Sequence, residues 1–131
     1  MKPVDQMFLV NRDGRGDCLR ACVASILELN PLDVPDFALF GHQWLQAMIC
    51  YCDFDLDTPD EAKGYWIAGG MSPRGIRHAV VYLDRQMVHD PHPSRSGLVG
   101  YVEDAIIVRG LKPNVREWMD KRSTTTPESP Q

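Results

Sequence analysis

The sequence has no long apolar run. No stretch approaches the roughly 20 apolar residues that a membrane-spanning helix requires. Residues 1–6 also lack the apolar core of a secretory signal peptide. These absences argue against a membrane partner, and we expect a cytoplasmic protein.

Basic runs and cofactor motifs are absent too. Lysine and arginine are scattered along the chain and the formal net charge is -4, so no basic run follows a nucleic-acid backbone. The pair Gly69-Gly70 is not followed by the lysine of a phosphate-binding loop. The acidic stretch 53–61 lacks the glycine and glutamate of a calcium loop at the required offsets. We therefore expect no nucleic-acid partner, no cofactor and no metal.

Cysteine is scarce, with 4 in 131 residues. A chain of this length forms one domain that buries roughly two-thirds of its unfolded surface without disulfides. The thiols are therefore expected to be free, catalytic or metal-bound. A zinc-binding module is one alternative, because Cys18-x3-Cys22 and Cys50-x-Cys52 offer four thiolates. Their setting argues against it, since structural zinc sites place ligand pairs about two to four residues apart on a turn. Cys18 and Cys22 instead lie one turn apart inside a predicted helix, and Cys50 and Cys52 point roughly opposite ways on another.

Apolar periodicity predicts a helix directly after a glycine-rich turn. With Asp17 as N-cap, apolar residues recur every three or four positions until Asn30-Pro31 ends the pattern. These positions are Leu19, Cys22, Val23, Ile26 and Leu27. A second helix is predicted over residues 42–52, where Trp44 is expected in the core or lining a groove.

Four later runs are typical of strands, because they are short, rich in β-branched or aromatic residues, and bounded by Gly, Pro or Asp. They are residues 65–68, 77–82, 86–90 and 105–109, and residues 53–63 are expected to form a loop. Helices followed by strands predict an α+β domain, with an antiparallel sheet packed against the helix that bears Cys18. This domain should span residues 1–122, and the Ser/Thr/Pro-rich residues 123–131 should form a disordered tail.

Cys18 is the strongest candidate nucleophile, because it lies at the start of the first predicted helix. A helix N-terminus carries about half a positive charge and unpaired N–H groups, which stabilise a thiolate and can bind an oxyanion. Cys22 lies one turn later on the apolar side of the helix and is expected in the core. The sequence therefore predicts a reactive thiol at position 18.

His78 and Asp90 provide a candidate base and a candidate orienting acid on adjacent predicted strands. Side chains alternate between the faces of a strand, so the connection length decides whether they meet. A three-residue connection, 83–85, places His78 opposite Asp90, whereas a two-residue turn sends Asp90 to the other face. A catalytic pair therefore predicts a connection of odd length.

These residues resemble the papain-like cysteine peptidase superfamily, especially small bacterial and phage members similar to double-glycine leader peptidases. The resemblance spans about residues 6–98. It rests on the Gly16-Asp17-Cys18 helix start, the His78-Ala79-Val80-Val81 strand and the segment His89-Asp90-Pro91-His92-Pro93-Ser94. It implies a papain-like core in which Cys18 attacks an acyl carbon, His78 acts as base and then acid, and Asp90 orients the imidazole.

The resemblance also implies that a glutamine upstream of the cysteine supplies an oxyanion donor. Gln6 is the only glutamine before Cys18, and Asn11, at the more usual distance, competes for that role. The implied activity is hydrolysis of a peptide, isopeptide or related acyl bond through a thioester acyl-enzyme, with a peptide or protein as substrate. A catalytically inactive papain-like protein that binds a peptide or inhibits an enzyme is the main alternative.

Overall fold

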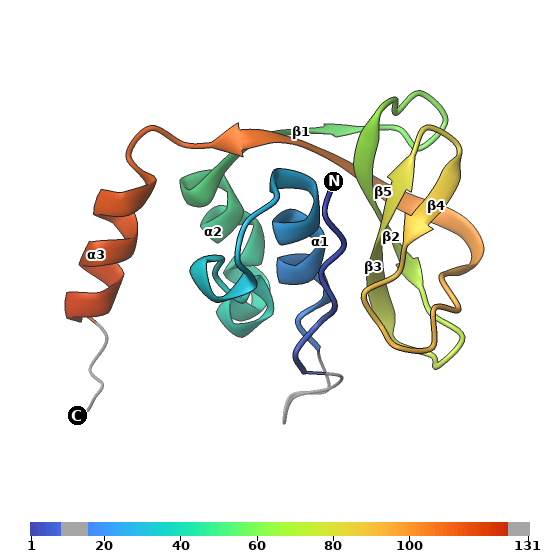
Figure 1. The fold of residues 1–131 in the computed structure, drawn as a ribbon, viewed down its shortest axis with the longest axis horizontal. Helices are drawn as coiled ribbons and strands as arrows, with labels where there is room; N and C mark the ends of the chain where they lie inside the picture. Colours follow the sequence, from blue (N-terminus) through green and yellow to red (C-terminus); the bar gives the residue numbers. More distant parts are fainter. Residues whose placement is uncertain (9–15, 126–131) are drawn as a thin grey trace.

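The architecture is one antiparallel sheet with helices packed on it (Figure 1). The computed structural model describes residues 1–8 and 16–125, with side chains up to Asp120. The helices are α1 (Cys18–Leu27), α2 (Trp44–Tyr51), α3 (Val115–Thr125) and the short 3-10 helices η1 (Pro31–Asp33) and η2 (Phe37–Gln43). The strands are β1 (Cys52–Asp57), β2 (Tyr65–Met71), β3 (Arg77–Leu83), β4 (Gln86–His89) and β5 (Val99–Leu111). Their order is β1-β5-β2-β3-β4, with every neighbouring pair antiparallel, so the predicted α+β class is confirmed.

Helix α1 lies against the sheet because one of its sides is apolar and made of small residues. Ala21, Cys22, Val23 and Ala24 are buried, and α1 contacts β3, β5 and β2. The sheet residues of this core are Ile67, Ala79, Val81, Ile106 and Val108. The predicted helix thus carries Cys18 at its first turn, directly above the sheet.

The other face of the sheet carries a second, smaller core. It consists of Ala62, Trp66, Ala68, Val80 and Ala105. The Trp66 ring lies 4.8 Å from the Tyr82 ring between centroids, and its Nε1–H donates to the Asp84 carbonyl at 2.8 Å. Strands β2 and β3 are therefore buried on both faces, which explains the nearly unbroken apolar run at residues 79–83.

Residues 1–8 connect α1 to the end of β4. The Val4 N–H donates to Ser25 Oγ on α1 at 2.9 Å, and the Val4 carbonyl is bonded to His89 Nε2 at 2.7 Å. The Gln6 N–H donates to the Pro91 carbonyl at 3.1 Å. In Figure 1 this dark-blue segment runs beside α1. The helix and the end of the hairpin are thus bonded to the same short segment.

The predicted loop over residues 53–63 is wrong in its first half, where β1 forms. Asp53 and Asp55 alternate with Phe54 and Leu56, which is the period of a strand. Arg109 on β5 donates to Asp55 at 2.6 Å and to Asp53 at 3.4 Å. Acidic residues disfavour strands, but this cross-strand pairing offsets part of that preference.

Other elements differ from the predictions in length or existence. Strand β5 begins at Val99, earlier than predicted, and α2 begins only at Trp44, after η2. Helix α3 was not predicted; it contacts α2, and the rings of Phe40 and Trp118 stack with centroids 6.5 Å apart. Helix α3 includes residues 123–125, so the predicted disordered tail is wrong for these three residues. Residues 126–131 lie outside the described residues. No helix within residues 1–8 and 16–125 is long and apolar enough to span a bilayer.

We expect Trp66→Ala to lower the free energy of unfolding by about 3–5 kcal/mol, because it empties the centre of the second core. Trp66 is 1% exposed. Tyr101→Ala is the control, because Tyr101 is 80% exposed and its loss should change stability by only about 0.5 kcal/mol. Urea unfolding followed by circular dichroism measures both; equal losses would show that the second core contributes little.

Candidate active site

The structure brings Cys18, His78 and Asp90 together from three elements. Cys18 is the first residue of α1, His78 is the second residue of β3, and Asp90 directly follows β4. His78 Nε2 and Asp90 Oδ1 are 2.7 Å apart, and both side chains are buried. Cys18 and His78 line one hollow of about 260 Å³. This arrangement places a thiol, an imidazole and a carboxylate in series.

Three donors hold the Asp90 carboxylate. Oδ1 faces His78 Nε2 and accepts the His92 N–H at 2.9 Å, and Oδ2 accepts the Gly97 N–H at 2.7 Å. Burial alone would raise the pKa of Asp90, but these hydrogen bonds and the charge of His78 outweigh burial and lower the pKa to about 2. Asp90 is therefore ionised wherever the protein is folded near neutral pH.

The pairing of His78 with Asp90 does not come from an odd-length connection, so that prediction is wrong. Leu83 pairs with Gln86, which leaves a two-residue turn. The register then shifts: Tyr82 pairs with Met87 but Val81 pairs with His89, so β4 carries one extra residue, Val88. This β-bulge restores the parity that the short turn would have lost. Asp90 consequently emerges on the face of His78.

The imidazole of His78 is placed between the carboxylate and the thiol. Burial by itself lowers the pKa of His78, but the hydrogen bonds to Asp90 and Cys18, and their charges, raise the pKa to about 9. Because Nε2 faces Asp90, Nδ1 is the ring nitrogen left for the Cys18 thiol. The site therefore favours an imidazolium at neutral pH, which is the state that stabilises a neighbouring thiolate.

Asp17 occupies the N-cap position of α1 but does not cap the helix, contrary to the prediction. Its carboxylate accepts the N–H of Phe8 at 2.9 Å and of Met7 at 3.2 Å, and it lies 3.5 Å from Arg20. The Asp17 N–H in turn donates to the Phe8 carbonyl at 3.3 Å. Asp17 thus provides no side-chain cap to the first turn of α1, where Cys18 lies.

Gln6 is not joined to Cys18 by a hydrogen bond among the described residues. Its Nε2 donates to the Phe8 carbonyl at 2.7 Å, while its Oε1 is buried without a hydrogen-bond partner there. The competing candidate, Asn11, lies outside the described residues. The oxyanion role of Gln6 therefore stays a prediction.

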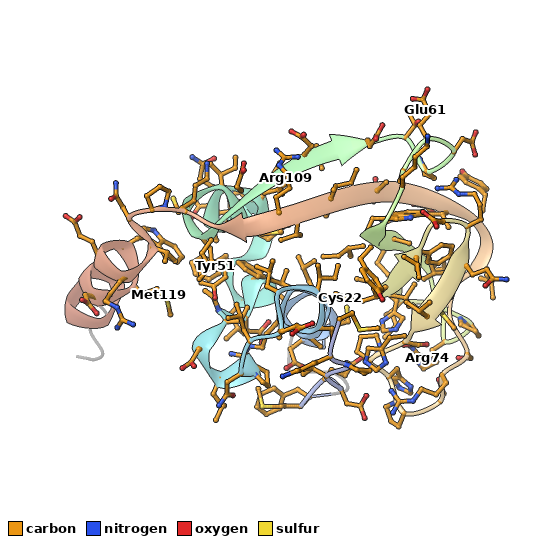
Figure 2. All side chains as sticks on the ribbon, turned by 45° about the horizontal axis from the view of Figure 1, so that its top comes forward. Cys22, Tyr51, Glu61, Arg74, Arg109 and Met119 are labelled. Carbon is orange, nitrogen blue, oxygen red and sulfur yellow. The ribbon has the colours of Figure 1, made fainter. Side chains whose placement is uncertain are left out.

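The remaining cysteines do not join the candidate triad. Cys22 is fully buried between α1 and the sheet (Figure 2), as expected for a core residue. Burial, followed by the charges of Cys18 and Asp90, raises the pKa of Cys22 well above its ordinary value. Burial likewise raises the pKa of Cys52 to about 12. Within residues 1–8 and 16–120, no three His, Cys, Asp or Glu side chains are grouped closely enough to hold a metal ion.

The hollow beside Cys18 and His78 is mainly apolar. Its other lining residues are Leu19, Trp44, Leu45, Leu56, Ile67, Gly69, Arg77, Ala79, Asp104 and Ile106. Trp44 was expected in the core or at a groove, and here it lines the hollow. Leu56 was missed because β1 was predicted as loop. The supporting N–H of Gly97 was also missed; a glycine seven residues after Asp90 was its only sequence signal.

No protein-family model, curated protein or solved structure matches this chain. The chemistry of the site is therefore inferred from its own geometry.

We expect the stability of the protein to depend on pH through His78 and Asp90. The pKa of His78 is raised from 6.5 to about 9, so its contribution is complete below pH 6.5 and is lost as the pH rises through about 9. The pKa of Asp90 is lowered from 3.8 to about 2, so its contribution is complete above pH 3.8 and is lost as the pH falls toward 2. Urea unfolding at pH 6 and 9 should show a loss in the wild type that is smaller in His78→Gln. Equal losses would assign the pH dependence to other groups.

Gly97→Ala should weaken the support of Asp90, whereas Gly100→Ala should not. Both glycines have left-handed φ angles, of 73° and 72°, so both substitutions carry a similar backbone penalty of about 1 kcal/mol. A Cβ on Gly97 would also lie 3.0 Å from Met87 Sδ, whereas Gly100 has open space. The Gly97 N–H lowers the pKa of Asp90, so we expect only Gly97→Ala to raise that pKa, measured by NMR titration. A similar pKa in both variants would show that the Gly97 N–H is dispensable.

Proposed function

We propose that this protein is a cysteine-dependent hydrolase that cleaves a peptide, isopeptide or related acyl bond. The observation that carries the proposal is the series of Cys18, His78 and Asp90, in which a thiol at a helix start shares a hollow with an imidazole bonded to a buried carboxylate. The helix bearing Cys18 packs on an antiparallel sheet, which fits a papain-like core. All four cysteines are free, which fits the cytoplasm as the proposed compartment.

The proposed reaction begins from a Cys18 thiolate and a His78 imidazolium, formed when the thiol proton moves to His78 Nδ1. The thiolate attacks the acyl carbon, and the carbonyl oxygen becomes an oxyanion that accepts hydrogen bonds from N–H groups at the start of α1, which Asp17 does not cap. The imidazolium then gives its proton to the leaving group as the bond to that group breaks, which leaves a thioester on Cys18. Water, deprotonated by His78, hydrolyses the thioester and restores the thiol. Asp90 holds the ring through Nε2 throughout.

The shape of the hollow favours a substrate with an apolar group next to the scissile bond. Trp44, Leu45 and Leu56 form part of its wall, beside the nucleophile. A peptide or protein is the substrate class that brings such a side chain together with an acyl bond. Burying that side chain would contribute roughly 1.5–3 kcal/mol to binding.

A catalytically inactive papain-like binding protein or inhibitor is the second candidate. The observation that favours it is the side-chain amide of Gln6, the predicted oxyanion donor. One of its N–H groups donates to the Phe8 carbonyl and not to Cys18. A zinc-binding module is less favoured, because Cys22 and Cys52 are buried in the core on different elements. The reactivity of Cys18 separates the enzyme from the binding protein.

We expect iodoacetamide to alkylate Cys18 selectively between pH 5 and 7, followed site by site by mass spectrometry. His78→Ala should slow this reaction at pH 6 by at least about tenfold, because the imidazolium no longer stabilises the thiolate. Cys50 is the internal control, since it is half-buried like Cys18 but is not among the residues that line the hollow. Cys18→Ser should remove the fast phase, and Cys50→Ser should leave it intact.

A slow reaction at Cys18 that does not depend on His78 would contradict the hydrolase and favour the binding protein.

A further inference from the structure

A polar cluster lies next to His78 and is not among the residues that line the apolar hollow. It consists of Arg74, on the turn between β2 and β3, and of His92, Ser94 and Ser96, on the loop after Asp90. Arg74 Nη1 donates to Ser94 Oγ at 3.1 Å and to Ser96 Oγ at 3.4 Å. The two hydroxyls are 2.8 Å apart, and Ser94 Oγ is 2.9 Å from His92 Nδ1. We call these four residues the rim cluster.

The rim cluster has a positive charge with no carboxylate partner among the described residues. Arg74 forms no ion pair with a carboxylate in the described part of the chain, whereas Arg77, Arg95 and Arg109 each do. A guanidinium has five N–H donors, and the hydrogen bonds of Arg74 to described residues use Nη1 alone. Its Nε and Nη2 therefore remain available to an anion, and Arg74 is exposed.

His92 adds a second outward donor to the rim cluster. Its Nδ1 accepts the Ser94 N–H at 3.0 Å, so the ring proton resides on Nε2. No hydrogen bond of Nε2 to a described residue occupies that N–H. Burial and then the nearby charge of Arg74 lower the pKa of His92 below its ordinary value of 6.5, which keeps the ring neutral near pH 7. A neutral N–H donor therefore lies near a guanidinium that has no carboxylate partner among the described residues.

The rim cluster is positioned by the same loop that supports the candidate triad. The rings of His78 and His92 are perpendicular, with centroids 6.2 Å apart. The backbone N–H of His92 also donates to the Asp90 carboxylate. A group bound at the rim cluster would therefore lie beside the imidazole that protonates the leaving group in the proposed reaction.

We propose that the rim cluster binds a carboxylate on the leaving portion of the substrate. This inference rests on the proposed function and adds a substrate class to it: an acyl donor that is apolar beside the nucleophile and acidic beyond the scissile bond. A carboxylate matches the planar fork of Arg74, with the His92 Nε2–H and the serine hydroxyls as further donors. It comes from either an acidic side chain or a C-terminus of the substrate.

The test uses alkylating probes that differ only in this charge. N-iodoacetyl-Gly-Gly and its C-terminal amide form one pair, and N-iodoacetyl-Asp-amide and N-iodoacetyl-Asn-amide form the other. For each pair we measure the ratio of the alkylation rates at Cys18, acid over neutral. We expect Arg74→Gln to lower the ratio about three- to tenfold for at least one pair, and 0.5 M NaCl to lower the wild-type ratio. The pair that responds identifies a terminal or a side-chain carboxylate.

Arg109→Gln is the matched control, because it removes the same charge from another exposed arginine. Figure 2 shows Arg109 at the top of the molecule and Arg74 apart from it, at the lower right. Arg74→Lys keeps the charge without the planar fork, so its acid-to-neutral ratio should lie between those of the wild type and Arg74→Gln. Unchanged ratios in Arg74→Gln, or an equal fall in Arg109→Gln, would overturn the rim cluster as a carboxylate site.

The two proposals fail separately. Iodoacetamide is neutral, so its reaction with Cys18 and the dependence of that reaction on His78 report only on the hydrolase. A fast, His78-dependent reaction with acid-to-neutral ratios that ignore Arg74 would refute the rim cluster alone. A slow, His78-independent reaction would refute the hydrolase, while the acid-to-neutral ratios would still report on charge at Arg74.

Discussion

The buried carboxylate of Asp90 constrains everything around it. Asp90 is 1% exposed, and an unpaired charge at such depth would cost many kcal/mol. Its donors come from β3, through His78, and from the following loop, through the N–H groups of His92 and Gly97. The ring orientation of His78 and the path of the loop are therefore fixed by a single charge. Because the loop also carries most of the rim cluster, that surface is fixed with them.

The β-bulge in β4 follows from a turn that has little freedom. Asp84 has a left-handed φ of 53° and donates its backbone N–H to the Gly64 carbonyl at 2.9 Å. Its carboxylate accepts the Gly64 N–H at 2.8 Å, and its carbonyl accepts Trp66 Nε1–H. The second core thus holds the two-residue turn in place. The parity of the hairpin is corrected further along, by the extra residue Val88. The packing of the turn and the placement of the charge pair are thus reconciled within one short strand.

Local patterns in the sequence predict the parts of the fold that local physics controls. The apolar period of α1 and the strands flanking Asp84 are readable because burial on the sheet imposes them. The bulge is not readable, because it depends on long-range contacts of the turn. Strand β1 is hidden by its aspartates, whose partner Arg109 is more than 50 residues away along the chain. The sequence likewise reveals Cys18, His78 and Asp90 through their residue types and their order. It does not reveal the backbone N–H groups of His92 and Gly97 that support Asp90, because those depend on the path of the loop.

The N-terminal segment links the two halves of the candidate site. Residues 1–8 are bonded to α1 through Ser25 and Asp17, and to the far end of the hairpin through His89 and Pro91. Asp5 adds an ion pair to Arg95 on the loop that carries the rim cluster. None of these groups takes part in the proposed chemistry. The segment acts as a strap, so a cut or displacement within these eight residues would loosen the alignment of thiol and imidazole while leaving both cores of the sheet in place.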